Sequence, residues 1–146
     1  MQSIFDKLSI IIDGCIRNEG IMKIFKAIFI LLCVTILFGC TTSVTSQNVY
    51  KKVQNKSIKP MIIDVRTEGE FKAGHVPGAV NLSLTSLIGR TDEINVKPND
   101  PIIVYCEHGP RASLAGVILK WSGFDNIQHL EGDMSGWREQ RLPVEK

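Results

Sequence analysis

A cysteine and an arginine separated by four residues form the part of this sequence best suited to chemistry. The segment joins an apolar run to a helical one and reads Cys106-Glu107-His108-Gly109-Pro110-Arg111-Ala112-Ser113. A helix N-terminus presents unpaired N–H groups and partial positive charge, which favour the thiolate form of a cysteine placed there. Gly109 permits backbone angles that turn amides into an anion-binding nest, and Arg111 adds a guanidinium. The segment predicts a nucleophilic Cys106 that acts on an anionic substrate.

The strands that position this loop are predicted from the hydrophobic pattern. Two apolar runs without alternation, 61–65 and 102–106, are typical of strands buried on both faces of a parallel sheet. Weaker strands are expected at 79–84 and 127–130. Cys106 then lies at the carboxyl end of a strand, where α/β sheets bind their ligands.

Helical segments alternate with these strands and are expected at 47–54, 68–73, 84–89, 112–122 and 134–140. In the helix after Cys106, Leu114, Val117, Ile118 and Trp121 recur at helical spacing and predict its buried face. Trp121 and Trp137 are expected in the core. The alternation predicts an α/β fold with helices on both faces of a parallel sheet.

Four motifs, in order along the chain, resemble the signatures of the rhodanese family. They are Ile63-Asp64-Val65-Arg66 with Glu70-Phe71, then Ala73-Gly74-His75-Val76-Pro77-Gly78-Ala79-Val80-Asn81, then the cysteine loop, then Gly132 to Trp137 with Leu142-Pro143. Asp133 replaces the second glycine of the family's closing motif. The resemblance covers about residues 45 to 144 and implies a rhodanese-like parallel sheet.

The resemblance implies that sulfane sulfur is transferred through a Cys106 persulfide, with thiosulfate or a related donor and cyanide or a thiol as acceptor. It makes Cys106 the catalytic residue and implies that no metal or organic cofactor is needed. The residues expected to bind the donor are Glu107, His108, Gly109, Arg111 and Ala112.

Three residues outside the loop are expected to support the site or the turn before it. Asp64 ends a buried strand and is expected to support the site by hydrogen bonding. Arg66 is expected to form an ion pair with Glu70, four residues on, that braces the following helix. His75 is interpreted as a structural residue of the turn before Pro77.

The loop departs from the commoner family pattern at two residues. Pro110 has no N–H, so the nest has one donor fewer, and Glu107 adds negative charge where an anion must arrive. Both put the efficiency with thiosulfate in question, and the sequence does not give the direction of the Glu107 side chain.

Three other functions remain open from the sequence. Cysteine phosphatases and arsenate reductases also couple Cys to Arg, but they place five residues between the two, whereas this chain has four. A binding or sensing module without turnover would commonly have lost the nucleophile. A sulfur carrier with a protein substrate would keep the same loop.

The composition of the chain excludes some classes of protein. Its 146 residues suffice for one domain, with 44% hydrophobic residues, 22% charged residues and a formal net charge of +2. A nucleic-acid-binding protein would show a more basic balance, and a disordered chain would be more polar. We expect a monomer that binds no nucleic acid.

The N-terminal region resembles a bacterial lipoprotein signal. Residues 27–38 carry no charge, follow Lys23 and Lys26, and are too short for a span of about 20 residues. The sequence Leu37-Phe38-Gly39-Cys40 resembles a lipobox, in which the cysteine is acylated and the chain is cut before it.

This interpretation predicts how the chain is divided into segments and where in the cell the protein lies. We expect an N-terminal extension at 1–21, if translation starts at Met1 rather than Met22. A signal peptide at 22–39, a lipidated tether at 40–46 and a rhodanese domain at 47–144 are expected to follow. Cys15 and Cys33 would be removed and Cys40 acylated, which leaves Cys106 as the free thiol. We expect a lipid-anchored protein of the cell envelope, with its domain on the periplasmic or extracellular side.

Overall fold

The structure is a computed structural model that describes residues 24–25, 28, 42–55 and 60–146. The chain divides into two units, Met1–Cys40 and Thr41–Lys146, and the second contains the fold. Cys40, the predicted extension and most of the predicted signal peptide lie outside the described residues.

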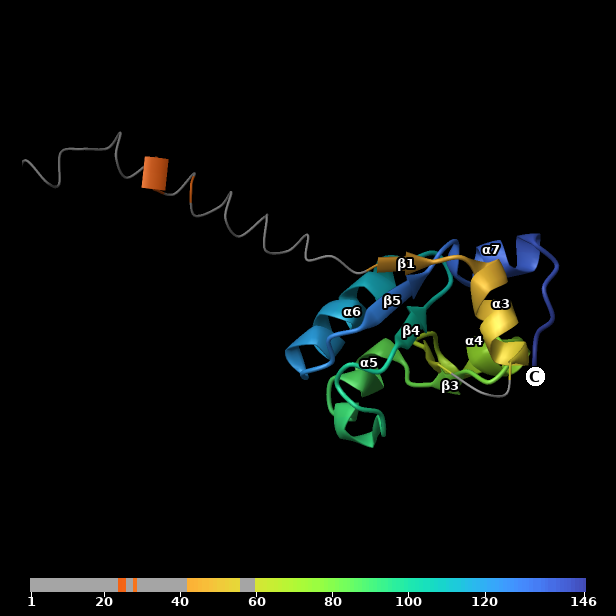
Figure 1. Ribbon diagram of the computed structural model, residues 1–146, viewed down its shortest axis with the longest axis horizontal. Helices are drawn as coiled ribbons and strands as arrows, with labels where there is room; N and C mark the ends of the chain where they lie inside the picture. The colour runs from red at the N-terminus through yellow and green to blue at the C-terminus, as the bar shows by residue number, and fades with distance from the viewer. Residues whose placement is uncertain (1–23, 26–27, 29–41, 56–59) are drawn as a thin grey trace, which may run out of the picture. The chain divides into compact units, whose positions relative to one another are not determined.

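Five parallel strands form a single sheet in the order β1-β5-β4-β2-β3 (Figure 1). The strands are β1 (Thr42–Val44), β2 (Met61–Asp64), β3 (Val80–Asn81), β4 (Ile102–Tyr105) and β5 (Ile127–Leu130). The helices are α3 (Ser46–Gln54), α4 (Glu68–Ala73), α5 (Leu84–Leu87), α6 (Pro110–Trp121) and α7 (Asp133–Glu139), with a 3-10 turn η1 (Thr91–Glu93). The predicted α/β fold with a parallel sheet is confirmed.

The strand that leads to Cys106 lies at the centre of the sheet. β4 pairs with β2 on one side and with β5 on the other, and all of its residues are fully buried. A strand covered on both faces needs apolar side chains at every position, which explains the unbroken run from Ile102 to Tyr105. The central position places Cys106 at the carboxyl edge of the sheet.

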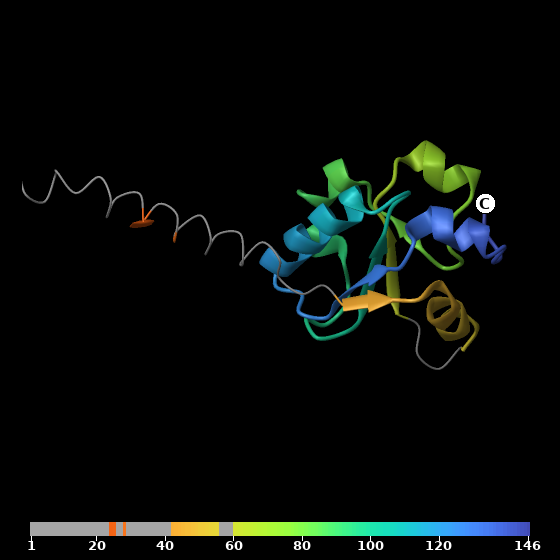
Figure 2. The same cartoon turned by 90° about the horizontal axis from the view of Figure 1, so that it is seen from above.

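Helices cover both faces of the sheet, and a separate apolar cluster fills each side (Figure 2). Ile63, Val104 and Leu119 belong to the cluster beneath α5 and α6. Ile103 and Trp137 belong to the cluster on the other side, beneath α3 and α7. Successive residues of each central strand therefore point into opposite halves of the core.

The structure differs from the predicted tether over residues 42–46. β1 adds to the sheet edge, with Thr42 opposite Gln128 and Val44 opposite Leu130. Thr45 then caps α3, because its Oγ1 accepts a hydrogen bond from the Asn48 N–H at 3.4 Å. A strand of three residues with a single buried apolar side chain, Val44, leaves no hydrophobic pattern to detect.

The predicted buried face of α6 is wrong at both of its ends, while Val117 and Ile118 between them are half-buried and Ile118 packs against the core. Leu114 is 53% exposed and Trp121 is 85% exposed. The residues of α6 that the structure buries are Ala112, Ala115, Gly116 and Leu119. Three of these four side chains are small or absent, so the helix axis can lie close to β4 and β5. The prediction for Trp137 is confirmed, since that residue is fully buried.

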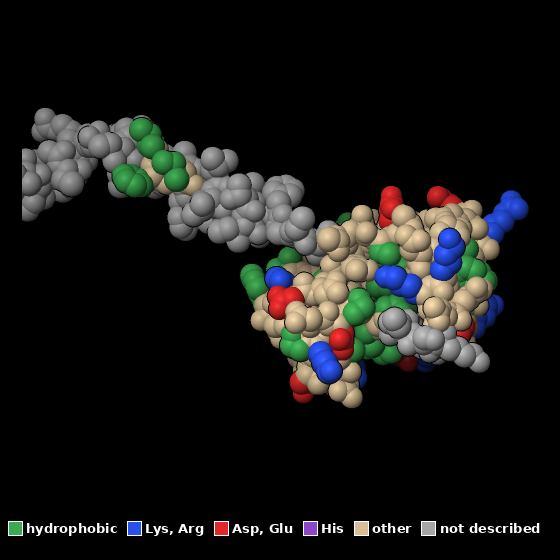
Figure 3. Space-filling view, in the orientation of Figure 1, with side chains coloured by type: hydrophobic (Ala, Val, Ile, Leu, Met, Phe, Trp, Pro, Cys, Tyr) green, Lys and Arg blue, Asp and Glu red, His purple; other side chains and the backbone are tan. Residues whose placement is uncertain are grey.

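On the face shown in Figure 3, acidic and basic side chains are interspersed over the described part of the domain. Among the described residues, no helix combines the length and the apolar character that a membrane span requires.

Candidate active site

Cys106 lies one residue beyond β4, in a turn that leads into α6. Gly109 caps α6 with a φ of 108°, a left-handed conformation that favours glycine, and Pro110 occupies the first helical position. This turn brings the Gly109 N–H back to the nucleophile, where it donates to Cys106 Sγ at 3.1 Å. The residue is only 1% exposed, so the thiol lies within the loop.

The start of α6 offers further backbone donors to the loop. The first amides of a helix have no carbonyl partner within the helix, which applies here to Arg111 and Ala112. Pro110 removes one amide, as the sequence indicates. The Ala112 side chain packs into the core, so its backbone alone is available to the loop, and His108 is exposed.

Arg111 reaches across to α4 and pairs with Glu70. Its Nη1 and Nη2 donate to the two carboxylate oxygens at 2.9 and 2.8 Å. This pairing holds the pKa of Glu70 well below its usual range and raises the pKa of Arg111. Cys106 contributes to the raised pKa of Arg111 after Glu70, because the guanidinium also lies near the sulfur.

The predicted ion pair between Arg66 and Glu70 is wrong. Glu70 is the N3 residue of a capping box, and its Oε2 accepts from the Thr67 N–H at 3.0 Å and from Thr67 Oγ1 at 2.7 Å. This cap and Arg111 engage the Glu70 carboxylate. Arg66 lies at a bend before the helix begins, so the four-residue spacing of a helix does not place it beside Glu70.

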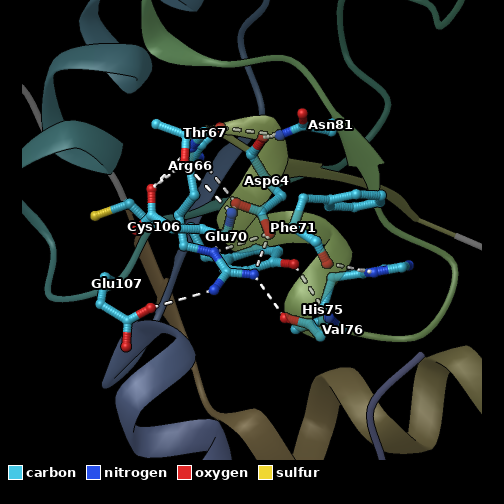
Figure 4. Close-up of polar contacts among 12 residues, drawn as sticks. Asp64, Arg66, Thr67, Glu70, Phe71, His75, Val76, Asn81, Cys106 and Glu107 are labelled. Atoms are coloured by element: carbon cyan, nitrogen blue, oxygen red, sulfur yellow. Dashed lines mark hydrogen bonds and ion pairs between the residues drawn. The ribbon is translucent and has the colours of Figure 1, made fainter. Parts of the chain in front are cut away.

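Arg66 instead forms a buried cluster with Asp64, the residue that ends β2 (Figure 4). Its Nη2 donates to Asp64 Oδ2 at 2.7 Å and to the Gly74 carbonyl at 2.8 Å, while its Nε contacts both carboxylate oxygens at 3.0 Å. Both side chains are fully buried. The Cys106 sulfur points away from this cluster, so Arg66 and Asp64 brace the strand ends behind the loop.

Glu107 extends from the loop to two arginines. Arg138 of α7 binds both of its carboxylate oxygens, and Arg66 Nη1 donates to Oε2 at 3.2 Å. Arg138 chiefly, and then Arg66, lower the pKa of Glu107. Its negative charge next to the nucleophile is therefore balanced by two guanidinium groups, a setting that the sequence did not indicate.

His75 lies in the turn after α4, as predicted. Its ring stacks on Phe71 with centroids 3.6 Å apart, and its Nδ1 lies 3.1 Å from the Phe71 carbonyl oxygen. Its backbone forms a bridge with Glu145. These contacts fit a structural residue.

Sequence reasoning missed two residues that lie against the loop, Asp133 and His129. Asp133 Oδ1 accepts a hydrogen bond from the Cys106 N–H at 2.8 Å, and His129 Nε2 lies 3.1 Å from both carboxylate oxygens. The available signal was the aspartate in place of the second glycine of the closing motif. A separation of 27 residues along the chain hid its contact with Cys106.

Within the described part of the chain, no group of three or more His, Cys, Asp or Glu side chains is arranged to hold a metal ion.

Comparisons with known proteins identify relatives in sequence and in fold. The chain is 29% identical over 115 residues to the uncharacterized protein YqhL of Bacillus subtilis. This match covers 75% of this chain and 90% of YqhL. It is 36% identical over 81 residues to the thiosulfate sulfurtransferase GlpE of Shewanella oneidensis, and this match covers 53% of this chain and 75% of GlpE. A full-length protein from Lactobacillus plantarum has a solved structure that matches with a TM-score of 0.63 and 27% identity, covering 83% of this chain and 97% of that one.

The share of each curated relative that this chain spans varies from 24% to 90%. The model of the rhodanese-like domain matches residues 35–140, which include the sheet, the cysteine loop and all of α7. The chain therefore belongs to the rhodanese-like domain family.

Proposed function

We propose that this protein is a sulfurtransferase that carries sulfane sulfur as a persulfide on Cys106. The observation that carries the proposal is the hydrogen bond from the Gly109 N–H to Cys106 Sγ, 3.1 Å long, at the junction of β4 and α6. An amide aimed at the sulfur stabilises a thiolate before the reaction and a persulfide anion after it. Thiosulfate sulfurtransferases among the relatives support the same reaction class.

The first half of the cycle loads the cysteine. The Cys106 thiolate attacks the outer sulfur of thiosulfate, a new S–S bond forms, and the original S–S bond breaks. Sulfite leaves with the electron pair of that bond, and the persulfide keeps one negative charge. The amides of Gly109, Arg111 and Ala112 are the donors available to that charge.

The second half of the cycle removes the sulfur from Cys106. An acceptor, cyanide in an assay or a thiolate in the cell, attacks the outer persulfide sulfur and takes it, while Cys106 leaves as the thiolate. No proton, electron or cofactor is required beyond the donor and the acceptor. The next cycle then starts from the same charge state.

The ion pairs around the loop affect which donors bind well. Arg111 already binds Glu70 through two hydrogen bonds, so an anionic donor competes with that carboxylate for the guanidinium. Because Arg138 and Arg66 balance the charge of Glu107, that residue repels the donor less than an unpaired carboxylate would. We propose that thiosulfate is accepted but bound weakly.

The loop length weighs against a phosphatase or an arsenate reductase. Four residues separate Cys106 from Arg111, and Gly109 closes the turn directly on the sulfur. Those enzymes place five residues between the cysteine and the arginine, so this loop is one residue shorter than theirs.

We also propose that the protein is anchored to a membrane by a lipid on Cys40. The support is the sequence pattern of a basic start, a short apolar run and Gly39-Cys40. β1 begins at Thr42, so the folded domain would start two residues after the acylated cysteine.

The test of the reaction is Cys106→Ser in a thiosulfate:cyanide assay. Serine is nearly isosteric and a far weaker nucleophile, so thiocyanate formation should fall to background while the circular dichroism spectrum stays unchanged. The matched variant Cys40→Ser, outside the loop, should keep turnover when both full-length proteins are assayed in detergent. Turnover of Cys106→Ser near the wild-type rate would reject the assignment of the nucleophile.

A further inference from the structure

Asp133 has an unusual backbone conformation for a residue that is not glycine. Its φ is 53°, in the left-handed region, and it is only 4% exposed. Aspartate tolerates this region better than most residues, but the conformation still costs free energy, and such strain is concentrated at functional sites. The preceding residue, Gly132, also has a positive φ of 75°, so the chain makes a sharp turn into α7.

The carboxylate of Asp133 does not cap its own helix. Acidic residues at a helix start commonly accept from the first backbone amides of that helix. The N-cap of α7 is Gly132, and no side chain caps the helix. Asp133 turns instead to the neighbouring loop, where Oδ1 accepts from the Cys106 N–H at 2.8 Å.

The same turn holds the other side of the Cys106 peptide. The Met134 N–H donates to the Cys106 carbonyl at 3.0 Å, next to the bond from the Cys106 N–H to Asp133. Both backbone polar groups of the nucleophile are therefore fixed by the first two residues of α7.

Asp133 and His129 also contact the far end of the loop. A side-chain carbon at Gly109 would lie 3.3 Å from Asp133 Oδ2 and 3.7 Å from His129 Cε1. His129 Nε2 lies 3.1 Å from each carboxylate oxygen, which fixes the plane of the carboxylate. The pair thus packs against Gly109, whose N–H donates to the Cys106 sulfur.

We infer that Asp133, held in place by His129, is a positioning residue for Cys106 in the proposed sulfur transfer. Its carboxylate binds the Cys106 amide and packs against Gly109, so it sets the position of the sulfur relative to the Gly109 N–H. The Cys106 N–H already donates to the carboxylate. The groups left to stabilise the persulfide anion are therefore the N–H groups of Gly109 and of the first turn of α6. The kinetic test of this inference rests on the proposed function, whereas its test by alkylation of Cys106 does not.

The decisive variants are Asp133→Gly and Asp133→Asn. Glycine relieves the positive φ and removes the carboxylate, whereas asparagine keeps an oxygen that accepts from the Cys106 N–H. We expect kcat with thiosulfate to fall about tenfold in Asp133→Gly, which corresponds to the loss of one hydrogen bond to a charged group. KM should stay within about twofold, because the groups that bind the donor are unchanged. Asp133→Asn should stay close to the wild-type kcat, and so should the exposed control Glu131→Gln on the same turn.

A second readout does not depend on sulfur transfer. Cys106 is 1% exposed, so the rate at which iodoacetamide alkylates it reports how firmly the loop is held. Alkylation should be several times faster in Asp133→Gly than in Asp133→Asn, with equal melting temperatures. If the wild-type protein failed to transfer sulfur, the proposed function would fall, while the alkylation rates would still test the positioning.

His129→Ala tests whether His129 acts through Asp133. Alone it should lower kcat and speed alkylation by a smaller factor than Asp133→Gly does. In the Asp133→Gly background it should have no further effect, because the group that it holds is gone. Additive effects of the two changes, wild-type kcat in Asp133→Gly, or an Asp133→Asn protein as impaired as Asp133→Gly would each overturn the inference.

Discussion

The chemistry attributed to Cys106 depends on side chains that three other elements, α4, α6 and α7, bring to the cysteine loop. Arg111, Glu70 and Asp133 each contact the loop or one another within 3 Å. The sequence predicted Cys106 and Arg111 as site residues, because their positions relative to the start of a helix indicate that chemistry. It did not predict which carboxylate pairs with which arginine. Glu70 lies closer in sequence to Arg66 than to Arg111, but the capping box of α4 turns it towards α6.

At this scale we predict the effect of Glu70→Gln. Glutamine keeps the capping-box pattern but frees the Arg111 guanidinium for the donor. Both members of this pair are about one-third exposed, and such pairs are weak, so KM for thiosulfate should fall about two- to fivefold with kcat unchanged.

Glu68→Gln is the matched control in steady-state kinetics. Glu68 lies on the same helix and pairs with Lys72 in an exposed position, so KM should not move. A KM for Glu70→Gln equal to the wild-type value would show that Glu70 does not compete with the donor.

The helix α6 shows why the elements were easier to predict than their orientation. Its sequence carries two stripes at helical spacing, one built on Ala112, Ala115 and Leu119, the other on Leu114 and Trp121. Hydrophobicity favours the second stripe. The sheet selects the first, because small residues allow the helix backbone to approach β4 and β5 closely. Hydrophobic periodicity predicts that a helix forms, but it does not predict which of the two faces packs against the sheet.

The two tryptophans test this assignment of faces. Trp121 is 85% exposed, and Trp121→Ala should change the free energy of unfolding by less than about 0.5 kcal/mol. Trp137 of α7 is fully buried in the cluster that α3 also covers, and its Nε1 donates to the Pro143 carbonyl at 2.8 Å. Trp137→Ala should lower the free energy of unfolding by about 3–5 kcal/mol. Urea denaturation of both variants gives the comparison, and a loss for Trp121→Ala as large as that for Trp137→Ala would place Trp121 in the core.

At the scale of the whole molecule, the parallel arrangement of the strands brings the site together. The neighbouring strands β2 and β4 end at the same edge of the sheet, so Arg66 and Glu107, which follow these strands, meet although 41 residues separate them. Alternation of strands and helices predicted this architecture. The strand order could not be read from the pattern, and β1 was missed because its three residues are mostly polar.

The proposed lipid anchor belongs to this scale as well. Cells fed a clickable palmitate analogue should label the wild-type protein on Cys40, and Cys40→Ala should carry no label. Two or more acyl chains hold a protein stably at a membrane, so the wild-type protein should also sediment with membranes. Equal labelling of both proteins, or an unlabelled wild-type protein, would contradict the proposed anchor.

The most direct test of the central claim is intact-mass and peptide mass spectrometry of the full-length protein after incubation with thiosulfate. We predict a gain equal to the mass of one sulfur atom, located on the peptide that contains Cys106 and removed by cyanide with release of thiocyanate. Cys106→Ser should gain nothing. A protein that gains no sulfur under these conditions, or one that gains it equally in Cys106→Ser, would contradict the account of Cys106 as the residue that carries sulfur.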